Sequence, residues 1–389
     1  VHAEDGYQLW SRTFDGTLAD VFGFQNDIAE GVARALGEVL EEPGLGAQAR
    51  TAGMTSNPEA YDRYLLARQI WRQRQEEPIR RSIELLREAL ALDPAFASAW
   101  SALASANLTL PAYTQDPGEA PARAEEAAYR ALALDNGQAE AHAVLGSLEL
   151  ARGAWIAAAA RFAQAREIAP NNSTIRVWSS EFFAKTGQIE RAISQIDTAL
   201  ELDPLYAPAM GNAGHQYASA GRLEEARVLF QKSWDLGLRA MFVWFGAYYV
   251  RLMQGHFDEA ERWLEERPSI PGLEADRALL TALRQPSANT TSRAVSAVRE
   301  ARAQGMGLRE AVLYLSALGA LDEAFRLMEP AKDMGWIQTE SLWSVWTEPL
   351  RRDPRFNPLV RALGLLDYWQ LHGPPAHCSL AEGRLRCPD

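Results

Sequence analysis

The carboxyl-terminal tail holds the residues whose types and spacing could do chemistry. His372, His377, Cys378 and Cys387 lie within 16 residues, and two imidazoles with two thiolates could in principle surround a zinc ion. The adjacent pair His377 and Cys378 fits zinc-finger spacing poorly. The two cysteines are nine residues apart, with Gly383 between them to allow a turn. We therefore predict a Cys378–Cys387 disulfide, with free thiols and a zinc site as the alternatives. A disulfide would favour an oxidising compartment.

Motifs for enzymatic chemistry are missing elsewhere. The sequence contains no phosphate-binding loop with its lysine, no H-E-x-x-H, no G-x-S-x-G and no C-x-x-C. The acidic runs at Glu76–Glu77 and Glu265–Glu266 fit solvated helix ends better than paired catalytic carboxylates. His142 fits a packed core position, whereas His215 could be a ligand contact or a pH-sensitive group. We therefore predict a protein that is not an enzyme and has no metal or cofactor.

Composition narrows the class of protein further. The chain has 389 residues, a net charge of −12, 47% apolar and 23% charged residues. This acidic balance argues against direct nucleic-acid binding and against binding to an anionic membrane. The longest apolar stretch, 240–250, is shorter than the roughly 18 residues that a membrane span needs. Because the chain opens at Val1 without a methionine, we expect a fragment or a processed form.

Four glycines set the frame in which these side chains must be positioned. Gly153, Gly187, Gly221 and Gly255 stand 34 residues apart, and an alanine follows each by five residues. A large apolar residue follows each glycine by nine residues, and Leu-Asp-Pro or similar sequences close the copies. This pattern resembles the tetratricopeptide repeat. The glycine would end the first helix of each hairpin, the alanine would allow close helix packing, and the proline would fit the first turn of the next helix.

The resemblance implies an all-α fold, a right-handed tetratricopeptide-repeat solenoid. Helical hairpins stack in such a fold because none can bury its apolar face alone. We expect a strand–helix remnant at 1–40, a linker at 41–57, six hairpins at 58–272, degenerate helical repeats at 273–335 and a tryptophan-rich cap with the cysteine tail at 336–389. A gap of 42 residues between the first two copies predicts an insertion of about eight residues at 110–118.

A second resemblance rests on the two ends of the chain. The segments 5–11 (DGYQLWS), 61–65 (YDRYL), 89–94 (ALALDP), 349–356 (PLRRDPRF) and 363–369 (LGLLDYW) are similar to the TolB-like and repeat region of bacterial CadC-like or ToxR-like regulators. The resemblance implies the sensory or interaction region of a signalling or transcription regulator in the periplasm. A similar segment also follows class III nucleotide cyclase domains, which would place it in the cytoplasm.

The inner face of the solenoid is the candidate partner site. In the repeat frame, the first helices contribute Tyr61, Tyr64, Arg68, Trp71, Arg72, Ser101, Ser105, Glu181, Lys185, His215, Phe242, Phe245 and Tyr249. Aromatic and arginine side chains often anchor partners, so we predict a groove for a protein or peptide. The alternatives are that the first-hairpin residues pack against the amino-terminal helix, and that the aromatic residues of hairpin six pack against 273–335. The runner-up function is a small-molecule sensor, with the ligand near His215, Phe245 and Tyr249. A homo-oligomer remains open.

Overall fold

A computed structural model describes residues 53–114, 116–268, 271–329, 336–376 and 378–387 of the chain. The expected strand–helix remnant at 1–40 and most of the expected linker lie outside the described residues. The first described helix starts at Pro58. The side chain of Asn57, directly before it, accepts hydrogen bonds from the backbone N–H groups of Glu59 and Ala60. This side-chain cap satisfies amide donors that have no partner within the helix.

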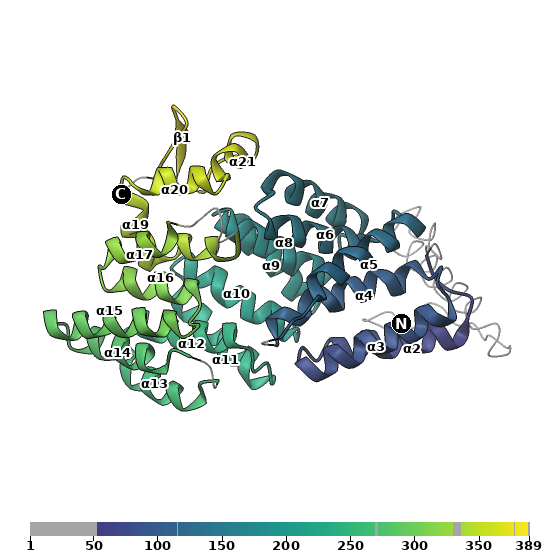
Figure 1. Cartoon of the computed structure of the whole chain (residues 1–389), viewed down its shortest axis with the longest axis horizontal. Coiled ribbons are helices and arrows are strands. Elements are labelled where there is room, and N and C mark those ends of the chain that lie inside the picture. Colours follow the sequence, from purple (N-terminus) through teal and green to yellow (C-terminus); the bar gives the residue numbers. More distant parts are fainter. Residues whose placement is uncertain (1–52, 115, 269–270, 330–335, 377, 388–389) are drawn as a thin grey trace, which may run out of the picture.

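Antiparallel helical hairpins follow one another along the described chain (Figure 1). They are α2 (Pro58–Trp71) with α3 (Glu76–Leu92), α4 (Ala97–Thr109) with α5 (Ala120–Leu134), α6 (Ala139–Ala151) with α7 (Trp155–Ile168), α8 (Ser173–Lys185) with α9 (Ile189–Leu202), α10 (Ala207–Ser219) with α11 (Leu223–Asp235), α12 (Met241–Met253) with α13 (Phe257–Trp263), α14 (Leu273–Arg284) with α15 (Ala288–Ala303), and α16 (Leu308–Ala317) with α17 (Leu321–Met328). Each hairpin packs on the next. The first helices of successive hairpins, from α4 through α6, α8 and α10 to α12, also contact one another. The prediction of an all-α solenoid is confirmed.

The four phased glycines end the first helices, as their spacing predicts. Gly153, Gly187, Gly221 and Gly255 have φ between 70° and 77°, a left-handed conformation that glycine adopts without a Cβ clash. After α8, for example, the N–H of Gln188 donates to the carbonyl of Phe183 at 2.9 Å. The chain can thus reverse within three residues and start the second helix.

Small residues let the paired helices approach closely. The alanines that follow the glycines by five residues, at 158, 192, 226 and 260, are fully buried. A Cβ added to Gly214 of α10 would lie 2.8 Å from the ring of Phe230 in α11. Phe230 is itself fully buried, so a side chain at Gly214 would have to displace a large core ring.

The prolines lie elsewhere than the sequence suggests. Pro94 is in the turn between α3 and α4, three residues before the first helical residue. Asp93 starts this turn: its side chain accepts from the N–H of Ala95 at 3.0 Å, and its carbonyl accepts from the N–H of Phe96 at 3.2 Å. Proline suits the second position of such a turn. The expectation that the proline of the Leu-Asp-Pro sequence occupies the first turn of the next helix is therefore wrong at Pro94.

The remaining described elements depart from the repeat. The insertion after α4 begins with a short 3-10 helix, η2 (Leu110–Ala112), and a further one, η3 (Leu264–Glu266), follows α13. The C-terminal segment, residues 336–387, contains η4 (Trp336–Trp343), η5 (Val345–Thr347), α19 (Glu348–Arg352), α20 (Phe356–Ala362), α21 (Leu365–His372) and an antiparallel pair of strands, β1 (Ser379–Ala381) and β2 (Arg384–Arg386).

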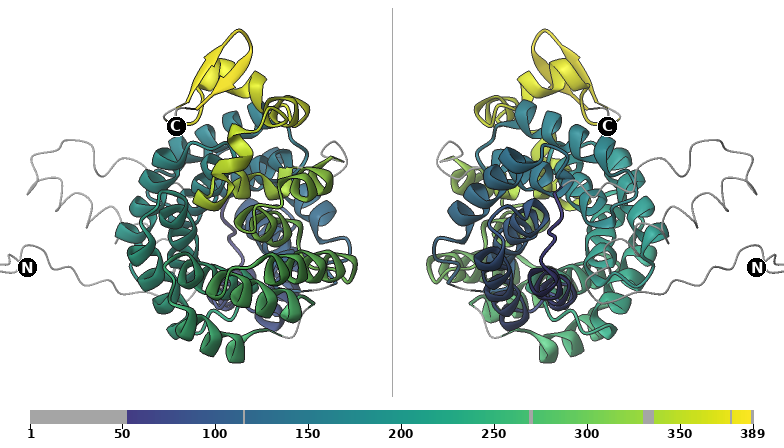
Figure 2. Two further views of the ribbon diagram at one scale, coloured as in Figure 1. Left: turned by 90° about the vertical axis from the view of Figure 1, so that its left-hand side faces the viewer. Right: turned by 90° about the vertical axis from the view of Figure 1, so that its right-hand side faces the viewer.

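This C-terminal segment returns to hairpins three and four. Viewed along the long axis, the hairpins run around a common axis, and the end of the chain lies against the earlier helices (Figure 2). The indole N–H of Trp369 donates to the carbonyl of Thr186 at 2.9 Å, and that of Trp343 to the carbonyl of Lys185 at 3.3 Å. A Cβ on Gly187 would lie 2.7 Å from the ring of Trp343. The glycine thus serves both the turn and the docking of the segment.

Candidate functional site

The aromatic and arginine residues of the first hairpin contact later hairpins. Arg68 of α2 forms an ion pair with Glu140 of α6, with Nη2 2.8 Å from Oε1. Trp71 is buried and donates its indole N–H to the hydroxyl of Thr109 at 2.9 Å. Arg72 forms an ion pair with Asp203, which follows α9. The curvature of the superhelix therefore brings hairpin one against hairpins two, three and four.

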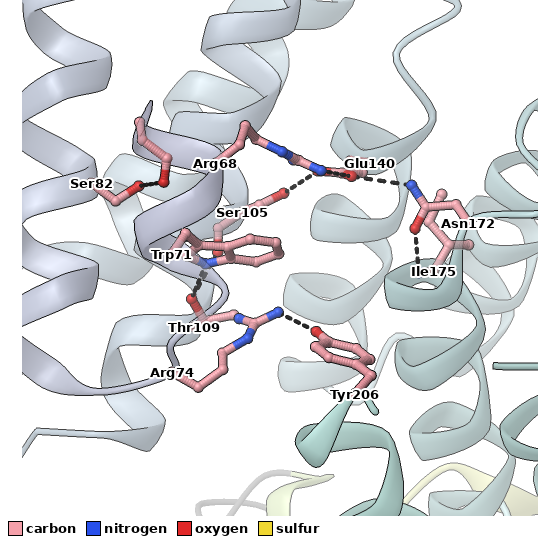
Figure 3. A network of polar contacts seen from close by, with 11 residues as sticks. Arg68, Trp71, Arg74, Ser82, Ser105, Thr109, Glu140, Asn172, Ile175 and Tyr206 are labelled. Atoms are coloured by element: carbon pink, nitrogen blue, oxygen red, sulfur yellow. Dashed lines mark hydrogen bonds and ion pairs between the residues drawn. The ribbon is translucent and has the colours of Figure 1, made fainter. Parts of the chain in front are cut away.

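Glu140 is the centre of this polar network (Figure 3). It also accepts hydrogen bonds from the hydroxyl of Ser105 at 3.2 Å and the amide of Asn172 at 3.1 Å. Burial alone would raise the pKa of Glu140, but the Arg68 guanidinium and these hydrogen bonds outweigh it and lower the pKa to about 2. Without Arg68, Glu140 would be a buried negative charge with hydrogen bonds but no ion pair. The Arg68–Glu140 pair therefore joins α2 to α6 and leaves neither charge available to a partner.

This packed region also contains the predicted groove residues of α2 and α4 that remain, namely Tyr61, Tyr64, Ser101 and Ser105. The rings of Tyr61 and Tyr64 stack with centroids 6.2 Å apart, and Tyr64 lies 5.0 Å from the ring of Phe96. Ser101 and Ser105 are buried in α4. The first hairpin contacts α4, α6, the insertion after α4 and the residues that precede α10. The amino-terminal helix proposed as its alternative partner lies outside the described residues.

Arg74 was missed by the sequence analysis. It follows α2 with a φ of 53° and is 4% exposed. Its guanidinium carbon lies 3.7 Å from the centroid of the Trp71 ring, and its Nη2 donates to the hydroxyl of Tyr206 at 2.5 Å. Its Nε is buried without a hydrogen-bond partner in the described part of the chain. Nothing in the run 72–75 (RQRQ) distinguishes this arginine from a solvated turn residue.

Next to Arg74, the inner helices line a partly open chamber with a volume of about 650 Å³, a size typical of small-molecule sites. The first helices α4, α6, α8, α10 and α12 form its wall, the insertion at 110–113 contributes to one side, and α16 and the C-terminal segment contribute to another. Apolar and aromatic side chains make up most of the surface, among them Tyr113, Trp178 and Leu313. We call this space the chamber.

Six of the predicted groove residues line the chamber. They are Glu181, Lys185, His215, Phe242, Phe245 and Tyr249. Phe245 and Tyr249 are buried against α16 and the C-terminal segment. The Phe245 ring stacks on Tyr314 of α16 with centroids 6.0 Å apart, and the Tyr249 hydroxyl forms a hydrogen bond with Ser344 of the C-terminal segment. The predicted residues of α8, α10 and α12 thus meet at one site, whereas those of α2 and α4 belong to the separate network around Glu140.

His215 is a packed member of the chamber wall. Its Nε2 lies 2.9 Å from the carbonyl oxygen of Phe242, and its ring meets that of Phe230 edge-on at 4.8 Å. Burial lowers the pKa of His215 to about 3, and Arg309 and Lys185 act in the same direction. The imidazole is therefore neutral at ordinary pH and donates from Nε2. A pH-sensitive role for His215 is not supported.

Glu181 is the chamber group with an unusual acidity. Burial raises the pKa of Glu181 to about 7, and Glu340 adds to this, while Lys185, Arg74 and a hydrogen bond with Asn212 oppose it. Lys185 is engaged by Glu340, with Nζ 2.8 Å from Oε2. Glu181 makes no ion pair within the described ranges of the chain, so it changes its charge near neutral pH.

The cysteines of the tail are joined. Cys378 and Cys387 form a disulfide across the β1–β2 hairpin, which is the preferred one of the three arrangements considered. Sulfurs bonded to one another cannot act as zinc thiolates. His372 stacks on Tyr368 with ring centroids 4.7 Å apart, and His377 lies outside the described residues. In the part of the chain that the structure covers, no three acidic, histidine or cysteine side chains gather as metal ligands.

Among the described residues, no helix combines the length and the apolar composition that crossing a bilayer requires.

Comparisons with known proteins agree with this architecture. A family model described as "Tetratricopeptide repeat" matches residues 149–213. The transcriptional regulator HilA of Salmonella paratyphi A is 25% identical over 189 residues, which are 48% of this chain and 32% of that protein. The chain thus spans about a third of the length of this curated relative.

Two solved structures are similar to this chain over part of its length. An IFIT1 monomeric mutant with m7Gppp-AAAA matches 86% of this chain and 80% of its own, with a TM-score of 0.50 and 12% identity. PilF of Pseudomonas aeruginosa matches 55% of this chain and 94% of its own, with a TM-score of 0.43 and 18% identity. The chain has the all-α tetratricopeptide-repeat solenoid fold.

Proposed function

We propose that this chain is the non-enzymatic sensory region of a bacterial signalling or transcription regulator, and that a small molecule bound in the chamber is its signal. The observation that carries the proposal is the chamber that the inner face forms together with α16 and the C-terminal segment. The inner face of the first helices, along which an extended peptide would lie, is shared here with α16 and the C-terminal segment around a partly open space of about 650 Å³. A space of this size with a mostly apolar lining suits a small molecule.

The regulator context has two supports. The ends of the chain resemble the TolB-like and repeat region of CadC-like regulators, and a stretch of the chain matches the transcriptional regulator HilA. Attachment to a nucleotide cyclase is the alternative context. The Cys378–Cys387 disulfide supports a periplasmic location, and labelling of thiols in intact cells tests it. Labelling of both cysteines without prior reduction would contradict that location.

Filling the chamber tests the sensory role. Ser147 of α6 lines the chamber, whereas Ser194 of α9 is exposed on the outside. A ligand that binds the native state raises the melting temperature by mass action. In a thermal-denaturation screen of small molecules, we expect compounds that stabilise the natural chain and Ser194→Phe but not Ser147→Phe. Compounds that stabilise all three equally, or a screen without any stabilising compound, would contradict the proposal.

A protein-binding scaffold is the second candidate, and an observation on the outer surface favours it. Leu205 is 74% exposed in the turn before α10, and Leu202 at the end of α9 is also exposed. Exposed apolar clusters often mark interaction sites. Capture of a partner by the natural chain and its loss with Leu205→Ser would support this role. Equal capture by both chains would count against this surface.

A further inference from the structure

The chamber wall carries a permanent positive charge that the protein does not neutralise. Arginine stays protonated in proteins, and Arg74 forms no ion pair with any described residue. Its Nε is buried without a hydrogen-bond partner among the described residues, and its Nη2 donates to the hydroxyl of Tyr206. The Trp71 ring beneath the guanidinium stabilises the cation in part. A buried charge without an opposite charge is costly, so this position favours an anion.

The other two cations of the chamber have carboxylate partners. Lys185 lies 2.8 Å from Glu340, and Arg309 lies 3.3 Å from Glu310 and 4.0 Å from the same Glu340. Glu181, with a pKa of about 7, is only partly ionised at neutral pH and can donate a hydrogen bond when protonated. Arg74 is therefore the chamber cation that forms no ion pair among the described residues.

The rest of the wall selects an apolar body for the ligand. Tyr113 and Pro111 of the insertion, Trp178 of α8 and Phe242 of α12 surround the space. A site of this kind holds a ligand by its apolar surface and fixes its orientation with a few polar groups.

We propose that the chamber binds a small organic acid with an aromatic or other apolar body, and that Arg74 holds its carboxylate. The inference rests on the proposed function, in which the chamber is the ligand site, and adds the chemical class of the ligand. The carboxylate accepts hydrogen bonds from Arg74, and the apolar body fills the space toward α12 and α16. A cationic ligand, drawn by Glu181 and Glu340, is the competing possibility that the experiment decides.

Three compounds with one body and different heads test the inference. Isothermal titration calorimetry at pH 7 with 4-phenylbutyrate, 4-phenylbutan-1-ol and 4-phenylbutylamine compares an acid, a neutral and a cationic head. We expect the acid to bind most tightly. Arg74→Gln should weaken acid binding about 30-fold, as loss of a buried charge pair does, while Arg74→Lys keeps most of it. The matched control is Arg166→Gln, because Arg166 also lies over an aromatic ring, that of Phe183, but outside the chamber.

The outcomes separate this inference from the proposed function. Alcohol binding that persists in Arg74→Gln shows that the variant is folded and its chamber intact. If the amine or the alcohol binds as tightly as the acid, or if Arg74→Gln binds the acid unchanged, the inference is wrong. Loss of that binding in Ser147→Phe would still support the chamber as a ligand site. If none of the three compounds binds, the inference is also wrong, and the sensory role is decided by the wider screen.

Discussion

Replacement of Glu181 by glutamine is the most direct test of the electrostatics inside the chamber. Glutamine keeps the shape and can keep the hydrogen bond with Asn212, but it cannot ionise. Burial raises the pKa of Glu181 from an ordinary 4.5 to about 7, so the folded chain holds this proton over a range in which the unfolded chain has released it. The natural chain should therefore lose stability as the pH rises from about 4.5 through about 7, and the variant should not share this loss.

The magnitude follows from the displacement of the pKa. Each pH unit of difference corresponds to about 1.4 kcal/mol, so the shift from 4.5 to about 7 corresponds to about 3 kcal/mol at most. The shifted pKa of Glu181 already contains the effects of the groups that face its carboxyl group, which are Lys185, Arg74, Glu340 and Asn212. Above pH 8, we expect the variant to be more stable than the natural chain by up to about 3 kcal/mol. Near pH 4.5, the two should differ little.

Urea denaturation followed by tryptophan fluorescence from pH 5 to pH 8.5 measures the effect. Other groups titrate over this range, so the informative quantity is the difference between the variant and the natural chain at each pH. Glu167→Gln on the exposed face of α7 removes the same charge outside the chamber and serves as the control. Parallel curves for the natural chain and Glu181→Gln would refute the reasoning, because the carboxyl group would then titrate alike in both states.

Three further changes test the frame around the chamber. Glu140→Gln leaves the Arg68 cation without its carboxylate and should lower the free energy of unfolding by about 3 kcal/mol, measured in urea; a loss below about 1 kcal/mol would indicate a solvated pair. Gly187→Ala and Gly221→Ala should each cost about 1 kcal/mol for their positive φ, but only the former meets Trp343, so only it should expose the C-terminal segment to limited proteolysis. Reduction of the disulfide should speed hydrogen exchange in β1 and β2 and leave the rest of the chain unchanged, because the loop it closes is short; a broad collapse would contradict this.

The repeat could be predicted because its signals are local. The end of each first helix needs a left-handed φ, which glycine supplies at Gly153 and Gly187. The close contact between paired helices needs a small residue, which the buried alanines supply. Both residue types therefore recur with the period of the hairpin. The same arithmetic places Glu181 and His215 on the inner face, where they line the chamber. Positions within a hairpin thus follow from the sequence of that hairpin.

The remaining features depend on the curvature of the whole superhelix. Arg74 and Tyr206 are 132 residues apart, and no local pattern relates a turn residue of hairpin one to the start of hairpin five. The same holds for Trp343, whose contact with Lys185 depends on how the C-terminal segment returns. The repeat frame therefore predicts a groove lined by the first helices alone, whereas in the structure distant parts of the same chain also line it.

The return of the chain end has a consequence for folding. In an open repeat array each unit contacts only its neighbours, so units can fray from either end and folding can spread from any point. Here the indole N–H of Trp155 donates to the carbonyl of Leu363, 208 positions later, at 2.6 Å. Contacts of such sequence separation slow folding, since a long loop must close before they form. The middle hairpins should therefore acquire their final stability only after synthesis of the chain is almost complete.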